Sequence, residues 1–351
     1  MAKRDRTLDY LRCLAMLWVI VVHVIYWGTF FGSARIYALL SLGLFEMPLF
    51  FFITGASNSF GREERYFSYV YRRFRRILVP YWVFGTLCGL WSAAAEAMAS
   101  GITLGRAAVV FGSWLIPWYS QITSLPYLKW IVWFVPVYLA MVLALPGMKK
   151  LVAGKYRMVF VPVALGLFAV SWVLDLFWVR IWLFYSLWTY LGLFYRQLRP
   201  ALEDKKIRRK LLLGSVVCAV VLGALLILTG EVDLQSHKFP PTPVFMVHAC
   251  AAMCLILSAV PAIDRFFAKL EARKPLGALI RIYSQRSTTI FLYQTFVFSA
   301  VVPITRLLIS GTGLLSGAAA SALCLALAVP GCALAAKVLG GIESWGTNSA
   351  K

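Results

Sequence analysis

The sequence predicts an all-α, polytopic membrane protein with about ten transmembrane helices. Its composition and its long apolar runs both indicate this class. Of the 351 residues, 61% are hydrophobic and only 14% are charged, and the mean hydropathy is +0.78. Soluble domains carry about 25% charged residues. Several apolar runs also approach or exceed the roughly 18 residues that cross a bilayer.

Polar loops separate these runs into individual spans. The spans are predicted at residues 8–30, 37–60, 75–98, 129–146, 157–175, 178–197, 211–230, 243–263, 287–309 and 314–340. The first run is too long for the h-region of a signal peptide, so we expect no removable leader. We expect residues 1–351 to form a single transmembrane domain without an appended soluble domain.

The basic residues indicate how the chain is oriented. The formal net charge is +21, and most lysines and arginines lie at the N-terminus and in loops 61–76, 147–157, 196–210 and 265–286. Basic loops stay in the cytoplasm, so an even number of spans places both termini there. The other side holds only six basic residues, which are Arg35, Arg106, Lys129, Arg180, Lys238 and Arg306. Most of the charge therefore reflects topology and contact with anionic membrane lipids, not binding to nucleic acid.

The first span carries three polar side chains, Asp9, Arg12 and His23. Arg12 and His23 are eleven positions apart, about three helical turns, so they share one face roughly 16 Å apart. Ionisable residues inside a membrane are costly and usually mark a functional path. A histidine packed against a neighbouring helix is the structural alternative. Asp9 lies about 21 Å of helix rise from His23 and is better placed to hold Arg12.

Two more polar residues lie inside predicted spans. Glu46, in LFEMPLFFFITG, is at a depth similar to that of His23 and is a suitable partner for it. Alternatively, Glu46 faces an outer aqueous vestibule. Pro48 and Gly55, which follow it, permit a kink and close helix packing. Gln294 in the ninth span needs hydrogen bonds from another helix or from a substrate.

Four arginines precede the third span in the run YRRFRRILVPYW. Arg72 and Arg75 are three positions apart, as are Arg73 and Arg76, so each pair projects from one side of a helix. Such a double fork at the cytoplasmic mouth suits a diphosphate or a 3′-phosphate. The alternative is a topological anchor of the positive-inside kind.

The seven cysteines all fall in apolar stretches. They lack histidine or carboxylate neighbours at metal-ligand spacing, so we interpret them as small buried hydrophobic residues. Neither a metal site nor a bound cofactor is expected.

Several motifs in order give the chain a family resemblance. They are the Arg12-x(10)-His23 pattern, PLFFFITG, RRFRRILVPYW, WFVPVYL, YLGLFYR and FPP, spread over about residues 5–300. With them the chain resembles the integral-membrane acyltransferases of family 3, bacterial enzymes that O-acylate cell-surface glycans. Three positions depart from the family pattern. Thr54 stands where serine is usual, Glu46 replaces a different polar residue, and Gln294 lies where a tyrosine-histidine pair is common.

The resemblance implies an activity and a place for it. A membrane-embedded enzyme would transfer an acyl group, most simply acetyl, from a cytoplasmic acyl-CoA such as acetyl-CoA to a hydroxyl. The acceptor would be an extracytoplasmic glycan or glycolipid, and the location the inner (cytoplasmic) membrane of a bacterial cell. The departure at Gln294 removes a second imidazole and leaves the partner of His23 open.

The roles that go with this activity fall on the residues already singled out. His23 would act as general base or carry the acyl group, with Glu46 beside it. Acyl-CoA binding would fall to Arg12, Arg72, Arg73, Arg75 and Arg76. Supporting roles would fall to Asp9, which holds Arg12, and to Thr54 or Gln294, which would bind the thioester carbonyl.

Two rival functions fit the same composition. A multi-pass transporter or flippase would use intramembrane Arg, His and Glu as a proton or substrate path, but the sequence shows no repeat symmetry and no paired broken helices. A non-catalytic partner in a glycan-assembly complex is the other. Hydrolysis of labelled acetyl-CoA, or transfer from it, by the purified protein distinguishes an acyltransferase from a transporter. Failure to bind acyl-CoA would favour the non-catalytic partner.

Overall fold

The computed structural model describes residues 5–61, 64–118, 121–124, 127–128, 131–311 and 313–345. Within these ranges the chain is helical and contains no strand. The helices of the first half are α1 (Arg6–Gly28), α2 (Ala34–Ser41), α3 (Glu46–Ser59), α4 (Tyr66–Ser100), α5 (Leu104–Ser113), α6 (Phe134–Ala153) and α7 (Phe160–Val173). Those of the second half are α8 (Phe177–Leu193), α9 (Tyr195–Ala201), α10 (Lys205–Thr229), α11 (Pro243–Glu271), α12 (Lys274–Gln285), α13 (Ser287–Leu308), α14 (Leu314–Leu339) and α15 (Ile342–Trp345).

Eight helical segments of the described chain are long and apolar enough to cross a membrane. They are α1, the α2–α3 unit, α4, α6, α10, α11, α13 and α14, and each coincides with a predicted span. The other two predicted spans contain α7, with 14 residues, and α8, with 17. Both are shorter than the roughly 18 residues that span a bilayer. The all-helical membrane class is confirmed, while the count of ten and the cytoplasmic termini stay predictions.

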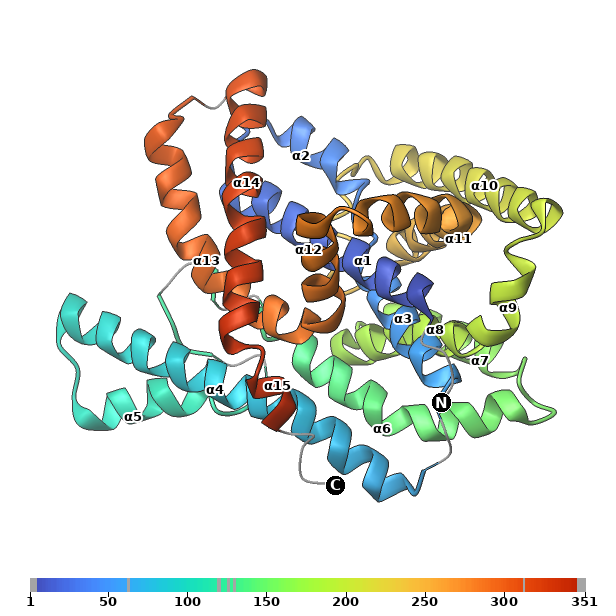
Figure 1. The fold of residues 1–351 in the computed structure, drawn as a ribbon, viewed down its shortest axis with the longest axis horizontal. Helices are drawn as coiled ribbons and strands as arrows, with labels where there is room; N and C mark the ends of the chain where they lie inside the picture. The colour runs from blue at the N-terminus through green and yellow to red at the C-terminus, as the bar shows by residue number, and fades with distance from the viewer. Residues whose placement is uncertain are drawn as a thin grey trace.

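Helix α1 lies in the middle of the bundle (Figure 1). It packs against α3, α11, α12, α13 and α14. The Asp5 side chain caps its first turn by accepting a hydrogen bond from the backbone N–H of Thr7 at 2.9 Å. Because protein surrounds α1 on several sides, its polar residues meet other helices.

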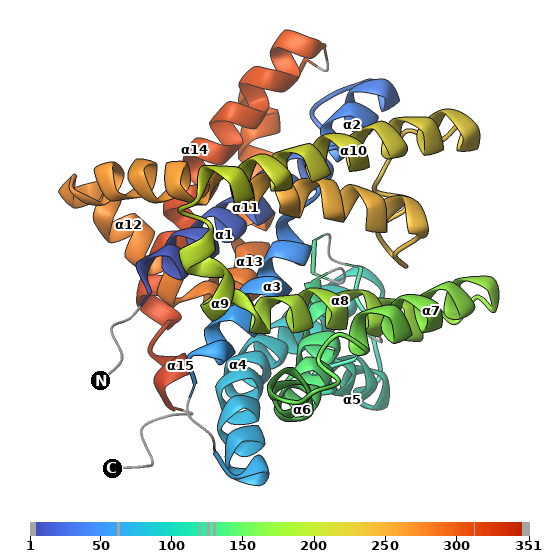
Figure 2. The same cartoon turned by 90° about the vertical axis from the view of Figure 1, so that its right-hand side faces the viewer.

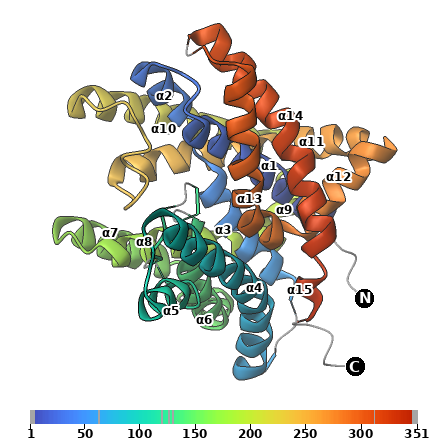
Figure 3. The same ribbon diagram turned by 90° about the vertical axis from the view of Figure 1, so that its left-hand side faces the viewer.

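Basic helix ends gather at one end of the molecule. The start of α1 and the start of α4 lie at the lower left of Figure 2, and α9 and α12 lie on its left side. Helix α2 and the far ends of α10 and α14 lie at the opposite end. Figure 3 shows α4 beside α13 and α15, and contacts join it to both.

The second span is interrupted between α2 and α3. Residues 42–45 form a turn, and the Trp18 indole N–H donates to the Gly43 carbonyl there. The break lies before Pro48, and α3 continues through Gly55 without interruption. Pro48 sits in the first turn of α3, where its missing N–H costs no helical bond. Glu46 therefore lies at a helix N-terminus, which favours a negative charge.

The crossing of α3 and α8 is too tight for side chains. A Cβ on Gly55 would lie 1.9 Å from the Thr189 carbonyl oxygen, and one on Gly192 would lie 2.1 Å from the Phe52 oxygen. Both neighbours are backbone atoms, which cannot rotate away. Small residues allow this approach and are typical of membrane helix interfaces.

Replacing Gly55 with alanine is expected to force the two helices apart. Overpacking of this kind costs about 1–3 kcal/mol of stability, so Gly55→Ala should lower the thermal unfolding midpoint in detergent. Gly166→Ala in α7 is the matched control, because nothing lies within 4 Å of that position. Equal midpoints for the two variants would contradict the tight crossing.

Candidate active site

A cavity of about 630 Å³ lies where α1, α3, α4, α6 and α13 converge. Its polar part is lined by Asp5, Asp9, Arg12, Ser57, Asn58, Arg73, Arg76 and Arg286. Four guanidinium groups against two carboxylates make this part net positive. The remainder of the wall is largely apolar and aromatic. A ligand with an anionic end and a short uncharged end matches this division.

Arg12 is held by groups from three helices. Its Nη1 lies 3.2 Å from Asp9 Oδ1 and 3.4 Å from the Ser284 carbonyl oxygen. Its Nη2 donates to Ser57 Oγ at 2.8 Å. The predicted contact between Asp9 and Arg12 is confirmed. Ser57 was missed, although it follows Thr54 by three positions on the same helix and so shares its face.

The four arginines of α4 divide into two pairs with different surroundings. Arg73 and Arg76 line the cavity, and Arg73 Nη2 lies 3.4 Å from Asn58 Oδ1. Arg72 pairs with Glu64 instead, and Arg75 Nη2 donates to the Trp345 carbonyl at 3.4 Å.

The predicted double fork is therefore only half present, since Arg72 and Arg75 lie outside the cavity lining. Successive helical positions differ by about 100°, so adjacent residues cannot face the same way. The spacing within each pair identifies which arginines share a side, but it does not say which pair faces inward.

Helix α13 brings its first turn to the cavity, a contribution that the sequence analysis missed. Arg286, Ser287 and Thr288 lie in the wall. The buried carboxylate of Glu343 in α15 accepts hydrogen bonds from Thr289 N at 2.8 Å and from Thr289 Oγ1 at 2.5 Å. Arg286 also donates to the Gly340 carbonyl. Glu343 of α15 thus caps the start of α13, and the end of α14 holds Arg286 at the cavity edge.

His23 lies outside the cavity lining and contacts Gln294. Its Nδ1 is 2.9 Å from Gln294 Oε1, and Gln294 Nε2 donates to the Phe291 carbonyl at 2.9 Å. That second bond fixes the amide, so Oε1 faces the imidazole and Nδ1 must carry the hydrogen. The Nε2 atom of His23 is then the unprotonated one, which can accept a proton or attack a carbonyl.

Aromatic rings hold the His23 imidazole in place. The Trp27 ring stacks on it with 3.9 Å between centroids and 4° between planes. Phe298 packs edge-on at 6.1 Å. Gln294 therefore orients His23. It stands at the position where the family pattern commonly has a tyrosine-histidine pair. Both hydrogen bonding and stacking restrict the ring to one orientation.

Glu46 does not contact His23, which corrects the pairing that similar depth suggested. Its buried carboxylate pairs with Lys238, which is also buried. Lys238 belongs to the segment between α10 and α11, and in the sequence it is only one of the few basic residues on the predicted outer side. No local pattern could have revealed the pair, because its members are 192 positions apart.

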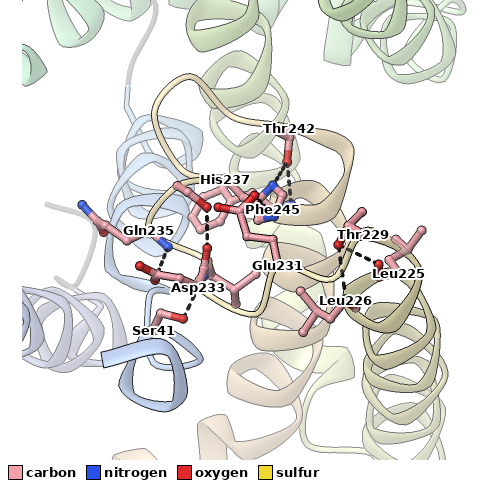
Figure 4. A network of polar contacts seen from close by, with 12 residues as sticks. Ser41, Leu225, Leu226, Thr229, Glu231, Asp233, Gln235, His237, Thr242 and Phe245 are labelled. Atoms are coloured by element: carbon pink, nitrogen blue, oxygen red, sulfur yellow. Dashed lines mark hydrogen bonds and ion pairs between the residues drawn. The ribbon is translucent and has the colours of Figure 1, made fainter. Parts of the chain in front are cut away.

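Local hydrogen bonds fix the segment that carries Lys238 (Figure 4). The backbone N–H of Leu234 donates to Ser41 Oγ at 2.8 Å, tying the segment to α2. His237 Nδ1 lies 3.1 Å from Thr242 Oγ1, and Thr242 caps α11. Lys238 is therefore delivered to Glu46 from a rigid loop.

Thr54 lines the cavity, but its hydroxyl is already engaged. Its Oγ1 donates to the Phe50 carbonyl of the preceding turn at 3.0 Å. That hydrogen is not free for a thioester carbonyl in this arrangement.

Two observations concern other ligands. Among the described residues, no group of three or more His, Cys, Asp and Glu side chains is arranged to hold a metal ion. A second cavity of about 660 Å³ is almost entirely apolar and lies between α1, α11, α12 and α14.

Comparison with known proteins identifies the family. A family model described as an acyltransferase domain matches residues 5–337, nearly the whole chain. The chain therefore belongs to this family, acyltransferase family 3, as its motifs indicated, and it is a multi-pass membrane acyltransferase. No curated protein and no solved structure matches it.

Replacing Lys238 should lower the stability of the protein far more than replacing one member of an exposed ion pair. Lys238→Met leaves the Glu46 carboxylate buried and unpaired, which is expected to cost about 3–5 kcal/mol of stability. Arg106→Met, which breaks the exposed pair with Glu96, is expected to cost less than about 1 kcal/mol. Tryptophan fluorescence during thermal unfolding measures both. The double variant Lys238→Met/Glu46→Leu should recover most of the loss, and additive losses would refute the pairing.

Proposed function

We propose that the protein transfers an acyl group, most simply acetyl, from a cytoplasmic acyl-CoA to a hydroxyl of an extracytoplasmic cell-surface glycan or glycolipid. The observation that carries the proposal is the arrangement along α1. Arg12 lies in the positively charged cavity, and His23, about three turns further along, presents an unprotonated Nε2. In the predicted topology the arginine end faces the cytoplasm, where acyl-CoA is found, and the enzyme lies in the cytoplasmic membrane.

The cavity suits the donor. The phosphates of acyl-CoA are recognised by Arg12, Arg73, Arg76 and Arg286, whose guanidinium groups make charge-assisted hydrogen bonds. The thioester then extends along the apolar part of the cavity toward His23.

His23 acts on the acceptor as a general base. Nε2 removes the proton from the acceptor hydroxyl while the oxygen attacks the thioester carbonyl carbon. The C–S bond breaks, and the CoA thiolate takes the proton from the imidazolium. Gln294 keeps Nδ1 protonated and the ring oriented throughout. Because a neutral amide stabilises the imidazolium less than a carboxylate would, the proton is readily returned to the thiolate.

An acyl-carrier role uses the same atom. Nε2 attacks the carbonyl carbon, and CoA leaves as the thiolate. The acceptor hydroxyl then attacks the acyl-imidazolium, the N–C bond breaks to restore neutral His23, and the thiolate takes the hydroxyl proton. Hydrogen bonding by Gln294 supports both routes, and detection of a labelled acyl-enzyme in the absence of acceptor distinguishes them.

The two arginine pairs of α4 should differ in donor binding. The double variant Arg73→Ala/Arg76→Ala is expected to weaken CoA binding by about 100-fold, at roughly 1.5–3 kcal/mol for a hydrogen bond to a charged group. Arg72→Ala/Arg75→Ala removes the same charge outside the cavity and should change binding less than about 3-fold. Calorimetry with CoA on protein in nanodiscs measures both. Equal losses would mean that net charge alone attracts the ligand.

Loss of the imidazole should abolish transfer without loss of the protein from the membrane. His23→Ala is expected to reduce surface acylation by more than about 100-fold, the scale of a general base. Mass analysis of surface glycans, with membrane content checked by immunoblot, is the measurement. Normal acylation in that variant would refute the assignment of His23, and an identical glycan profile with and without the protein would refute the acceptor class.

A further inference from the structure

Aromatic side chains form the end of the cavity that lies opposite its arginines. On three helices, the cavity-lining residue furthest from the arginines is aromatic. These residues are Phe50 on α3, Tyr81 on α4 and Phe134 on α6. Phe291 of α13 completes the group. The Phe134 and Phe291 rings lie 4.7 Å apart between centroids, and Phe50 packs edge-on against Phe134 at 5.8 Å.

This aromatic end lies next to His23. The carbonyl of Phe291 accepts the hydrogen bond from Gln294 Nε2, and Gln294 Oε1 contacts the imidazole. Phe291 and Gln294 are three positions apart on α13, which is about 4.5 Å of helix rise. Phe291 therefore belongs to the last layer of the cavity before the layer that contains His23.

The ring of Phe134 has little room to move. Phe51 and Tyr138 pack against it with centroids at 5.6 and 5.3 Å. Phe51 in turn stacks on Tyr185 of α8 at 4.4 Å, next to the close crossing of α3 and α8. Phe134 is 8% exposed and Phe291 is 5% exposed, so this end of the cavity is a wall of packed rings.

We infer that Phe134 and Phe291 set the length of the acyl group that the enzyme accepts and favour a short one. The inference rests on the proposed function, since it takes the ligand to be an acyl-CoA whose thioester points toward His23. With its carbonyl carbon at His23 Nε2, an acetyl group places only one methyl against the two rings. Each further methylene must displace a packed aromatic side chain, and packed interiors resist added volume.

Binding of acyl-CoAs of increasing length tests the inference. Calorimetry on the purified protein in nanodiscs compares CoA, acetyl-CoA, butyryl-CoA and octanoyl-CoA. The wild-type protein should bind butyryl-CoA at least about 10-fold more weakly than acetyl-CoA, the scale of discrimination by one or two methylenes in a closed pocket. Phe291→Ala and the milder Phe291→Leu should reduce that ratio at least about 5-fold, and Phe134→Leu should act in the same direction.

Phe168→Ala in α7 is the matched control. Phe168 is 4% exposed, packs against Phe184 and lies outside the cavity, so its loss should leave the ratio unchanged. Because the readout is a ratio of two affinities, partial loss of folded protein does not alter it.

The outcomes separate the inference from the proposed function. Equal affinity of the wild-type protein for acetyl-CoA and octanoyl-CoA overturns the length limit, and so does an unchanged ratio in both Phe291 variants. If neither CoA nor any thioester binds, the proposed function itself fails.

Discussion

The half-buried Arg12 guanidinium is the constraint on which the site depends. A charge at this depth is tolerated only when protein groups replace the water it has lost. Asp9, Ser57 and the Ser284 carbonyl do so, and they come from α1, α3 and α12. Satisfying one side chain therefore draws three helices together. The cavity lies at this meeting point, where Arg12, Arg73 and Arg286 are each held by a hydrogen-bond partner.

A second charged group, the Glu46 carboxylate, is buried at the opposite end of the bundle. Glu46 is buried where the second span breaks, and Lys238 neutralises it from a loop rather than from a helix. A buried pair adds little net stability but makes wrong arrangements costly, since either charge alone would be unpaired. The pair thus determines where the loop between α10 and α11 lies relative to α3. Figure 4 shows the local bonds that keep this loop rigid.

The hydrogen-bond partner of His23 is a neutral amide, not a carboxylic acid. A glutamine side chain fixes the tautomer of His23 and leaves the imidazole with a neutral partner. The Nε2 atom of this ring carries no hydrogen and is the atom that can accept a proton. Close stacking on Trp27 maintains its orientation. These features suit a group that must accept and return a proton within one reaction cycle.

The sequence by itself determined the membrane class, eight of the spans, the family and the local pair of Asp9 and Arg12, because each depends on composition or on neighbours within one helical turn. It did not determine the break before α3 or the partners of His23 and Glu46. Those partners are 271 and 192 positions away, and only the packing of whole helices brings them together. Tertiary packing also decides that Arg73 and Arg76 line the cavity while Arg72 and Arg75 do not. The rotation of a helix about its own axis is set by everything that packs around it.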